Sequence, residues 1–362
     1  TLTNSMNNQA NPSIPFLFYG RGSAFIFLAL LILVTACGQA GSAASASVPV
    51  TEELVGLVQP TPLAGFISTA TATIPTTPTA TATPIPTATA TATPTFTPTP
   101  THTPTPDPVT LVNGVPIEHI IIMPPDTQAH VRRIFAKGQE MGRNPHAFSK
   151  VGDSTSLTSH YLVRFDQKRY NLGIYEDLQE TIDYYDNSFK RFGVALRIGL
   201  HSWIAFRPGD ADPNKCGVDE HMVGCEFRLH NPSVLLIRLG TNDTATGDAY
   251  ERAMRHAIEY SIENGVIPVL VTKSDRFEGD NRHNETMRDL AQEYKIPLWD
   301  FDVVAGTLPD RGLGKDGIHL TSYATNDYTA PAALSFGYPL SDLTGLMMLD
   351  AIRRTVSQEG SE

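Results

Sequence analysis

After residue 110, apolar runs typical of buried strands alternate with segments in which apolar residues have helical spacing. Nearly continuous apolar runs at 233–239 (SVLLIRL) and 266–272 (VIPVLVT) predict strands of a parallel sheet covered on both faces. Shorter runs predict strands at 146–151, 194–198 and 296–301. Segments with helical spacing lie at 127–141, 175–185, 248–265, 284–294 and 343–356. This alternation predicts a doubly wound α/β/α sandwich with a mainly parallel sheet, where ligands gather at the carboxyl ends of the strands.

The N-terminal segment does not show this alternation of strands and helices, and its sequence predicts export. Arg21 precedes an apolar run at 24–34, which is short for a membrane span of about 20 residues but fits the apolar part of a signal peptide. The sequence LVTAC then resembles a bacterial lipobox, so residues 1–37 are expected to be a signal region with lipidation at Cys37. An uncleaved N-terminal anchor is the alternative. Both interpretations place the rest of the chain outside the cytoplasm, and the location expected is membrane-anchored or secreted.

Residues 38–109 are expected to form a disordered linker. Residues 71–108 are almost entirely Thr, Pro and Ala, which favours polyproline II and leaves too little apolar bulk for a core. At about 3.1 Å per residue, such a spacer reaches on the order of 100–150 Å. We therefore interpret it as a stalk that holds a folded domain, residues 110–362, away from a membrane.

Charge is concentrated in that predicted domain. Arg21 and three acidic residues are the only charged side chains before residue 109, which leaves 26 basic and 35 acidic residues, a net charge of −9, after it. This balance disfavours nucleic acid as a partner, because nucleic-acid binding depends on Lys and Arg that neutralise phosphates. About 250 residues suit one α/β domain with a sizeable core.

Three polar clusters follow predicted strands. Residues 152–154 (GDS) follow the first strand, 240–243 (GTND) follow the third, and Asp316 and His319 follow the last. The carboxyl ends of parallel strands meet at one edge of a sheet, so we expect the three clusters to lie together. The ordered set is much stronger evidence of a site than any one member.

The three clusters resemble the motifs of an SGNH hydrolase of the GDSL esterase/lipase superfamily. The resemblance covers roughly residues 145–355 and rests on GDS at 152–154, GTND at 240–243 and DGIH at 316–319. It implies a flavodoxin-like fold and ester hydrolysis through an acyl-enzyme, without metal or cofactor.

The resemblance also implies a role for each matching residue. Ser154 would be the nucleophile and His319 the general base, while Asp316 would orient the imidazole. Asn242 and the backbone N–H of Ser154, at the start of an expected helix, would donate to the oxyanion. A glycine after the second strand completes this pattern, and Gly199 is the best candidate because it ends the predicted strand. The other candidates for this glycine are Gly173 and Gly193.

The residue chemistry agrees with these roles. Serine is a weak nucleophile until a base accepts its proton, and histidine has one nitrogen for that proton and one for a carboxylate. Each residue also has an ordinary structural interpretation: Ser154 as a helix N-cap, Asp316 as a turn residue, Asn242 as a cap of the next helix. Asp153 is expected to support its turn. Three further histidines, with no evident partner, are expected to be solvated or core residues: His160, His201 and His283.

Two cysteines remain if Cys37 carries a lipid. Cys216 and Cys225 are separated by eight residues, and in an exported protein such a pair predicts a disulfide that pins a surface loop. A zinc site with His221 or His230 is the alternative.

The sequence therefore predicts a surface-tethered carboxylester hydrolase whose substrate is an acyl ester, with an acylated glycan of the envelope as one candidate. An O-acyltransferase would use the same three residues and pass the acyl group to a sugar hydroxyl. A non-catalytic carbohydrate-binding module of the same fold is a third alternative, although no residue of the triad is lost here. The sequence makes no prediction of oligomeric state.

Overall fold

The computed structural model describes residues 109–244 and 247–357. The predicted signal region with Cys37, and the linker up to residue 108, lie outside the described residues. None of the helices in the described ranges combines the length and apolar character needed to cross a membrane.

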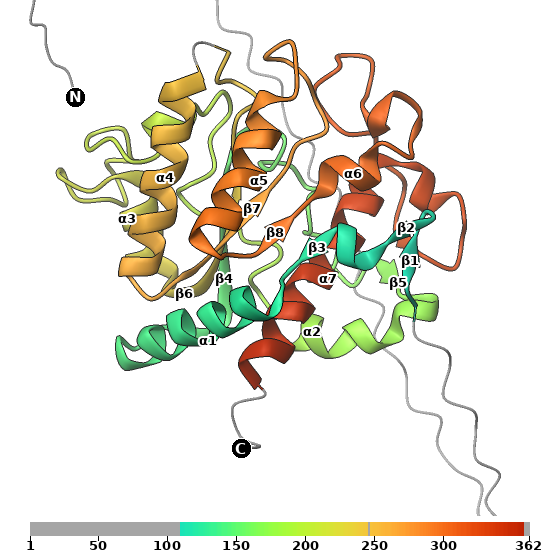
Figure 1. Cartoon of the computed structure of the whole chain (residues 1–362), viewed down its shortest axis with the longest axis horizontal. Coiled ribbons are helices and arrows are strands. Elements are labelled where there is room, and N and C mark those ends of the chain that lie inside the picture. The colour runs from blue at the N-terminus through green and yellow to red at the C-terminus, as the bar shows by residue number, and fades with distance from the viewer. Residues whose placement is uncertain (1–108, 245–246, 358–362) are drawn as a thin grey trace, which may run out of the picture. The chain divides into compact units, whose positions relative to one another are not determined.

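A five-stranded sheet forms the centre of the domain, in the order β3-β8-β7-β6-β4 (Figure 1). The strands are β3 (Ile121–Ile122), β4 (Asn144–Gly152), β6 (Pro232–Arg238), β7 (Ile267–Val271) and β8 (Leu298–Trp299). Strands β4, β6, β7 and β8 are parallel, whereas the short edge strand β3 is antiparallel to β8. Every residue of β6 and β7 is buried, as the apolar runs predicted.

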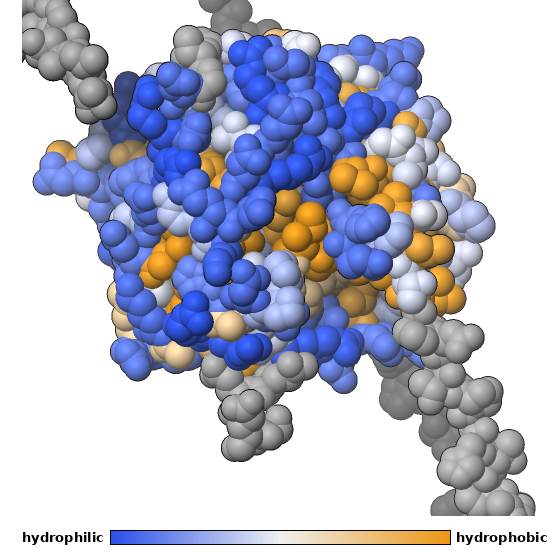
Figure 2. Space-filling view, in the orientation of Figure 1, coloured by the Kyte–Doolittle hydropathy of each residue, from blue (hydrophilic) through white to orange (hydrophobic). Residues whose placement is uncertain are grey.

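Helices cover both faces of the sheet and confirm the three-layer α/β/α fold. They are α1 (Pro125–Glu140), α2 (Gln179–Tyr184), α3 (Met222–His230), α4 (Gly247–Glu263), α5 (Arg282–Tyr294), α6 (Phe301–Ala305) and α7 (Gly337–Ser357). Alternate residues of β6 separate the two cores, since Val234 and Leu236 pack with α1, α6 and α7, while Leu235 and Ile237 pack with α3, α4 and α5. The exterior in the view of Figure 2 is mainly hydrophilic, with smaller hydrophobic patches between the hydrophilic residues.

The second predicted strand, 194–198, is not formed. Only Leu196 makes a parallel bridge, to Gly152 at the end of β4. Two backbone bonds hold this segment there, from Gly152 N to Ala195 O at 3.3 Å and from Arg197 N to Gly152 O at 3.2 Å. The chain then turns away at Gly199, so the predicted strand contributes only one β-bridge to the sheet.

The helix expected after Ser154 is also absent. Residues 153–168 form a succession of turns and bends. Leu162 has φ 64° and its backbone N–H donates to Asp342 Oδ1 on α7 at 2.7 Å. The two residues are 180 positions apart in the sequence. Their hydrogen bond satisfies the backbone N–H of Leu162, which would bond within the helix if one formed, so a tertiary contact takes the place of helical hydrogen bonding.

Several short elements were not predicted. They are the hairpin β1 (Leu111–Val112) and β2 (Val115–Pro116), the parallel pair β5 (Tyr170–Asn171) and β9 (Asn326–Asp327), helices α3 and α6, the edge strand β3, and the 3-10 helices η1 (Ile117–His119), η2 (Gly173–Leu178), η3 (Ser202–Ile204), η4 (Pro309–Gly312) and η5 (Ala333–Ser335). The helix predicted at 175–185 is divided between η2 and α2, and Tyr175 within η2 departs from helical backbone angles. These elements have too few residues to show a hydrophobic period.

Candidate active site

The structure brings Ser154, His319 and Asp316 into contact at one edge of the sheet. Ser154 lies two residues after the end of β4, whereas Asp316 and His319 lie in the loop between η4 and β9. His319 Nε2 lies 2.9 Å from Ser154 Oγ, and His319 Nδ1 lies 2.7 Å from Asp316 Oδ2. Three side chains from distant parts of the chain therefore form one continuous hydrogen-bonded series.

The 316–319 loop holds this arrangement through its own backbone. Asp316 Oδ1 accepts hydrogen bonds from the backbone N–H groups of Ile318 and His319, both at 3.0 Å. Gly317 has φ 68°, a conformation that glycine adopts without strain, so the loop turns back within three residues. The carboxylate thus binds the imidazole with one oxygen and the loop backbone with the other.

Electrostatics keep the Asp316 carboxyl group ionised. The hydrogen bond from His319, followed by the two backbone N–H bonds, lowers the pKa of Asp316 to about 2. An ionised carboxylate accepts the proton on Nδ1, which leaves the lone pair of Nε2 directed at Ser154 Oγ. This tautomer is the one that can accept the serine proton when Oγ attacks a carbonyl carbon.

Asn242 lies on the other side of the nucleophile turn. It follows β6, and its Nδ2 donates to Asp153 Oδ2 at 3.2 Å and to Leu200 O at 3.3 Å. Asp153 is fully buried, and its Oδ1 accepts from both the backbone N–H and the hydroxyl of Thr155, at 2.9 Å and 2.8 Å. Asp153 therefore supports its turn, as predicted, and also orients Asn242, which the sequence did not reveal.

The three candidate glycines have different surroundings. Gly199 has φ 70°, is exposed, and has no atom within 4 Å of where a Cβ would lie. It directly precedes Leu200, whose carbonyl binds Asn242, so it lies next to the Asn242 side of the site although it does not end a strand. Gly193 packs against the Glu226 carboxylate and Gly173 against Thr329. Gly199 remains the predicted oxyanion glycine, for its position beside Leu200.

The three remaining histidines lie apart from this series. His160 Nδ1 is 2.9 Å from an Arg164 nitrogen, and the His201 ring stacks on Trp203 with 5.4 Å between centroids. His283 is buried against Tyr250, with 4.0 Å between their ring centroids. Burial, and the nearby Lys273, lower the pKa of His283, which is therefore uncharged at neutral pH.

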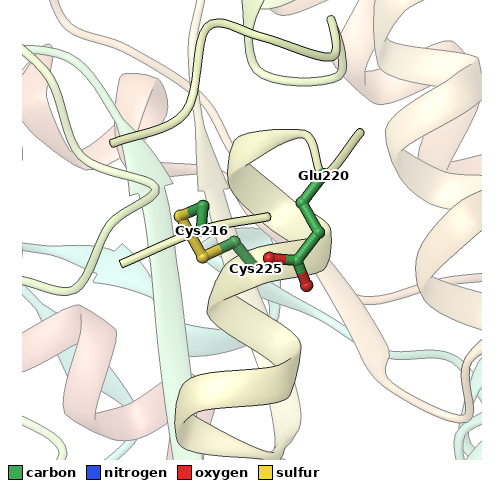
Figure 3. A group of neighbouring side chains, drawn as sticks. All are labelled: Cys216, Glu220 and Cys225. Carbon is green, nitrogen blue, oxygen red and sulfur yellow. A yellow bond between two sulfur atoms is a disulfide. The ribbon is translucent and has the colours of Figure 1, made fainter. Parts of the chain in front are cut away.

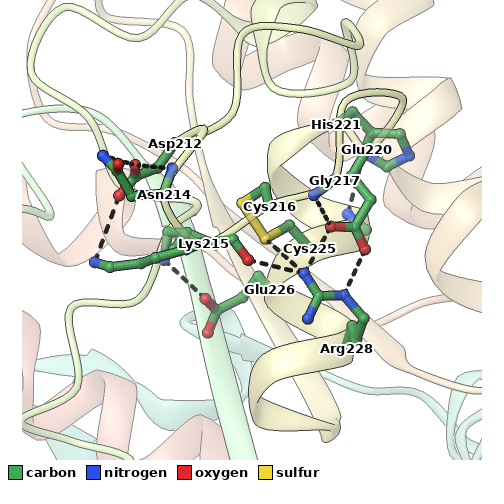
Figure 4. Close-up of a disulfide and its surroundings, with 12 residues drawn as sticks. Asp212, Asn214, Lys215, Cys216, Gly217, Glu220, His221, Cys225, Glu226 and Arg228 are labelled. Carbon is green, nitrogen blue, oxygen red and sulfur yellow. Dashed lines mark hydrogen bonds and ion pairs between the residues drawn. A yellow bond between two sulfur atoms is a disulfide. The ribbon is translucent and has the colours of Figure 1, made fainter.

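The predicted disulfide between Cys216 and Cys225 is present (Figure 4). Cys225 is buried within α3, so the bond joins the preceding loop to a helix rather than closing a loop on itself. Glu220 lies beside the two sulfur atoms, as expected of a metal-binding group (Figure 3). The sulfur atoms are bonded to each other, however, and a disulfide has no thiolate to bind a metal, so the alternative of a zinc site through these cysteines is wrong.

The sequence reasoning missed one further polar cluster beside the site. Lys273 and Asp275 follow β7 in the segment TKSD, at the same sheet edge as the other motifs. Asp275 Oδ2 accepts a hydrogen bond at 3.0 Å from Thr241, the residue before Asn242. The strand-end rule that found the other clusters also applies to TKSD and could have identified it.

Comparison with known proteins gave matches among solved structures alone, since no family model and no curated protein matches the chain. A two-domain esterase (CEX) active on acetylated mannans is 15% identical with TM-score 0.41, over 68% of this chain and 58% of its own. A putative lipolytic protein of the G-D-S-L family from Desulfitobacterium hafniense DCB-2 is 15% identical with TM-score 0.35, over 56% of this chain and 98% of its own.

A third similar structure is the psychrotrophic esterase EstA from Pseudoalteromonas sp., 15% identical with TM-score 0.36, over 59% of this chain and 100% of its own. The chain thus spans little more than half the length of the two-domain esterase. At these identities, any statement about the chemistry of this chain depends on the geometry of its own site.

Proposed function

We propose that this chain is a serine ester hydrolase of the SGNH type, which works through an acyl-enzyme on Ser154. The observation that carries the proposal is the hydrogen-bonded series from Ser154 Oγ through His319 to Asp316. The GDS, GTND and DGIH motifs, each at an expected place in the fold, support it. The remaining parts of the proposal follow from the chemistry that this geometry allows.

In the acylation step, Ser154 Oγ attacks the carbonyl carbon of an ester as His319 Nε2 takes its proton. The C–O bond to the alcohol breaks when His319 returns that proton to the leaving oxygen, which forms the acyl-serine. In the second step, His319 takes a proton from water, the resulting hydroxide attacks the acyl carbon, and Ser154 leaves with the proton restored. The products are a carboxylic acid and an alcohol.

Asn242 is the proposed side-chain donor to the oxyanion. Its Nδ2 now donates to Leu200 O at 3.3 Å, a long bond between uncharged groups. A negatively charged oxygen is a stronger acceptor than a carbonyl, so an oxyanion can replace Leu200 O as the acceptor of one N–H of Asn242. The backbone N–H groups of Ser154 and Gly199 are the proposed second and third donors.

We further propose that the enzyme lies outside the cytoplasm, anchored through residues 1–37, and acts on acylated glycans. The predicted stalk and export signal support the location. The exposure of the site supports a large substrate, since the side chains of His319 and Asp316 are 42% and 51% exposed. An ester on a polymer can approach an exposed site, whereas it could not enter a deep cavity.

A panel of acyl esters, assayed with the purified protein, tests the proposal. The wild type should release carboxylic acid, and a fluorophosphonate should label Ser154 alone. Ser154→Ala should abolish both. Ser156→Ala is the matched control, because Ser156 lies in the same turn with its hydroxyl buried and unpaired among the described residues.

Two outcomes would contradict the proposal. Ester cleavage by Ser154→Ala at the wild-type rate would remove Ser154 from the mechanism. Transfer of the acyl group to an added glycan, in preference to water, would instead identify an O-acyltransferase with the same acyl-enzyme.

A further inference from the structure

A buried charged cluster lies behind the loop that carries Asn242. It consists of Lys273 and Asp275 after β7, Glu278 in the following loop, and His283 in α5. All four side chains are at most 2% exposed. Lys273 Nζ lies 2.8 Å from Asp275 Oδ1 and also binds the Glu278 carboxylate, while His283 Nδ1 lies 3.5 Å from Glu278 Oε1.

This cluster is unusual for a protein core. Charges withdrawn from water lose solvation that their mutual attraction repays only when every group is well paired. Here Glu278 Oε1 and His283 Nδ1 have no hydrogen-bond partner among the described residues. Incomplete pairing makes the cluster a poor source of stability, so its retention calls for another physical reason.

A hydrogen bond of Asp275 links the cluster to the loop that carries Asn242. Asp275 Oδ1 is occupied by Lys273 and by the backbone N–H of Phe277 at 3.2 Å. Asp275 Oδ2 accepts from the Thr241 hydroxyl at 3.0 Å. Thr241 directly precedes Asn242 and is itself buried. One oxygen of the Asp275 carboxylate therefore binds Lys273, and the other holds the loop that carries Asn242.

The residue after Asn242 is anchored in a comparable way. The Asp243 carboxylate accepts from the backbone N–H of Ser202 at 3.1 Å and from its hydroxyl at 2.9 Å. On the other side of Thr241, Gly240 lies against the Tyr250 ring, and this ring packs at a tilt on the His283 ring. Asn242 is thus half-buried between two buried neighbours, Thr241 and Asp243, each of which is held by a side-chain hydrogen bond.

We propose that Asp275, held by Lys273, is a positioning residue that fixes the Asn242 amide through Thr241, so that the oxyanion donor is in place before substrate binds. This inference rests on the proposed function. Donors that need no rearrangement when charge develops stabilise a transition state more than mobile ones do. Small misplacements of such groups reduce rates strongly. The cluster is therefore expected to affect kcat rather than substrate binding.

Thr241→Val and Thr241→Ser form the matched pair that tests this. Valine keeps the shape of threonine but removes the hydroxyl that binds Asp275, whereas serine keeps the hydroxyl and loses a methyl group. We expect Thr241→Val to lower kcat roughly ten-fold on a simple ester with KM nearly unchanged, and Thr241→Ser to stay within about two-fold of the wild type. Urea unfolding of each variant shows that the protein measured is folded.

The same pair in an Asn242→Ala background distinguishes positioning from a general effect on structure. If Thr241 acts through Asn242, Thr241→Val should cause no further loss of kcat once the amide is gone. An equal loss in both backgrounds would overturn the proposal, as would a change in KM alone or a wild-type kcat for Thr241→Val. Failure of the proposed function is a separate result, because Ser154→Ala would then still cleave the ester.

Discussion

Ser154 and Ser156 lie two residues apart in one turn, and only their surroundings in the structure show which hydroxyl group can act as a nucleophile. Ser154 Oγ lies 2.9 Å from an imidazole nitrogen, whereas the Ser156 hydroxyl is fully buried without a partner among the described residues. A serine becomes a nucleophile only when a neighbouring base accepts its proton, so the presence of that base identifies the nucleophile better than the residue type does. No α-helix begins at Ser154, which removes its alternative role as an N-cap.

The first prediction concerns the nucleophile and its base. Ser154→Ala should lower kcat by several orders of magnitude and leave the free energy of unfolding nearly unchanged, because the side chain caps no helix. His319→Ala should lose a similar factor, and the double variant little more, since the two groups act as a unit. Steady-state kinetics with urea unfolding measure both quantities. Additive losses would contradict a shared proton transfer.

The second prediction concerns pH. The pKa of Asp316 is lowered to about 2 by its bond to His319, so Asp316 stays ionised throughout the working pH range. Asp316→Asn removes the anion that orients His319 and stabilises the imidazolium formed when it takes the serine proton. Steady-state kinetics on a simple ester should therefore show a loss of activity in the variant at every pH of this range.

A matched control for that experiment is Asp310→Asn, since Asp310 lies in the same loop region with φ 48°, a conformation that asparagine tolerates. Its pH profile should match the wild type. Wild-type activity of Asp316→Asn across the same pH range would show that Asp316 does not act on the imidazole.

At the scale of elements, the disulfide joins a loop to the first half of α3. Cys225 is buried against the same core as α4 and β6, so the bond restrains the 212–221 segment relative to that core. The segment otherwise depends on exposed contacts such as Arg228 with Glu220. Exposed ion pairs contribute little to stability, which leaves the disulfide as the main restraint.

The third prediction is that the double variant Cys216→Ala, Cys225→Ala unfolds with a free energy lower by roughly 2–3 kcal/mol, the value expected for so short a closed loop. Urea unfolding of both proteins, with and without reductant, measures this. Reductant should destabilise the wild type and leave the double variant unchanged. Equal sensitivity of the two proteins would contradict the prediction.

At the scale of the whole domain, α7 connects the turns after Ser154 to the opposite side of the fold. Asp342 on α7 is fully buried and accepts from Leu162 N–H and from Asn326 Nδ2 at 2.8 Å. Burial raises the pKa of Asp342 to about 7, although Asn326, Leu162, Arg164 and Lys150 act in the opposite direction. A carboxyl group whose pKa rises on folding favours the native state only while it is protonated.

The fourth prediction follows from that sign. The contribution of Asp342 to stability is present below its unfolded pKa near 4 and is lost as pH rises through about 7, a change of up to about 4 kcal/mol. Asp342→Asn stays neutral and lacks this dependence. Urea unfolding from pH 4 to 8 should show the wild type losing stability relative to the variant. A pH-independent difference would contradict the raised pKa.

The fifth prediction concerns the domain boundary. Both hydrophobic cores consist of residues between 112 and 356, so a chain that begins at residue 109 should fold cooperatively. It should also keep the ester hydrolysis that we propose, measured on a small soluble ester. Loss of soluble, folded protein on removal of residues 1–108 would place the boundary elsewhere.

The fold class and the candidate site residues could be predicted from the amino-acid sequence. Long buried strands such as β6 and β7 leave continuous apolar runs, and helices such as α1 and α5 leave a 3.6-residue period. Parallel strands end at one edge, so GDS, GTND and DGIH could be placed together without coordinates. The disulfide was predictable because the two cysteines are close in sequence.

Features that depend on contacts between distant residues became evident only in the folded structure. Leu162 forms a turn because Asp342 takes its N–H, Asp153 orients Asn242, and Asp275 binds Thr241. The strand predicted at 194–198 contributes a single bridge because its partner β4 ends there. Such contacts join residues tens of positions apart or more, and a hydrogen bond across that separation imposes no period on the chain from which it could be predicted.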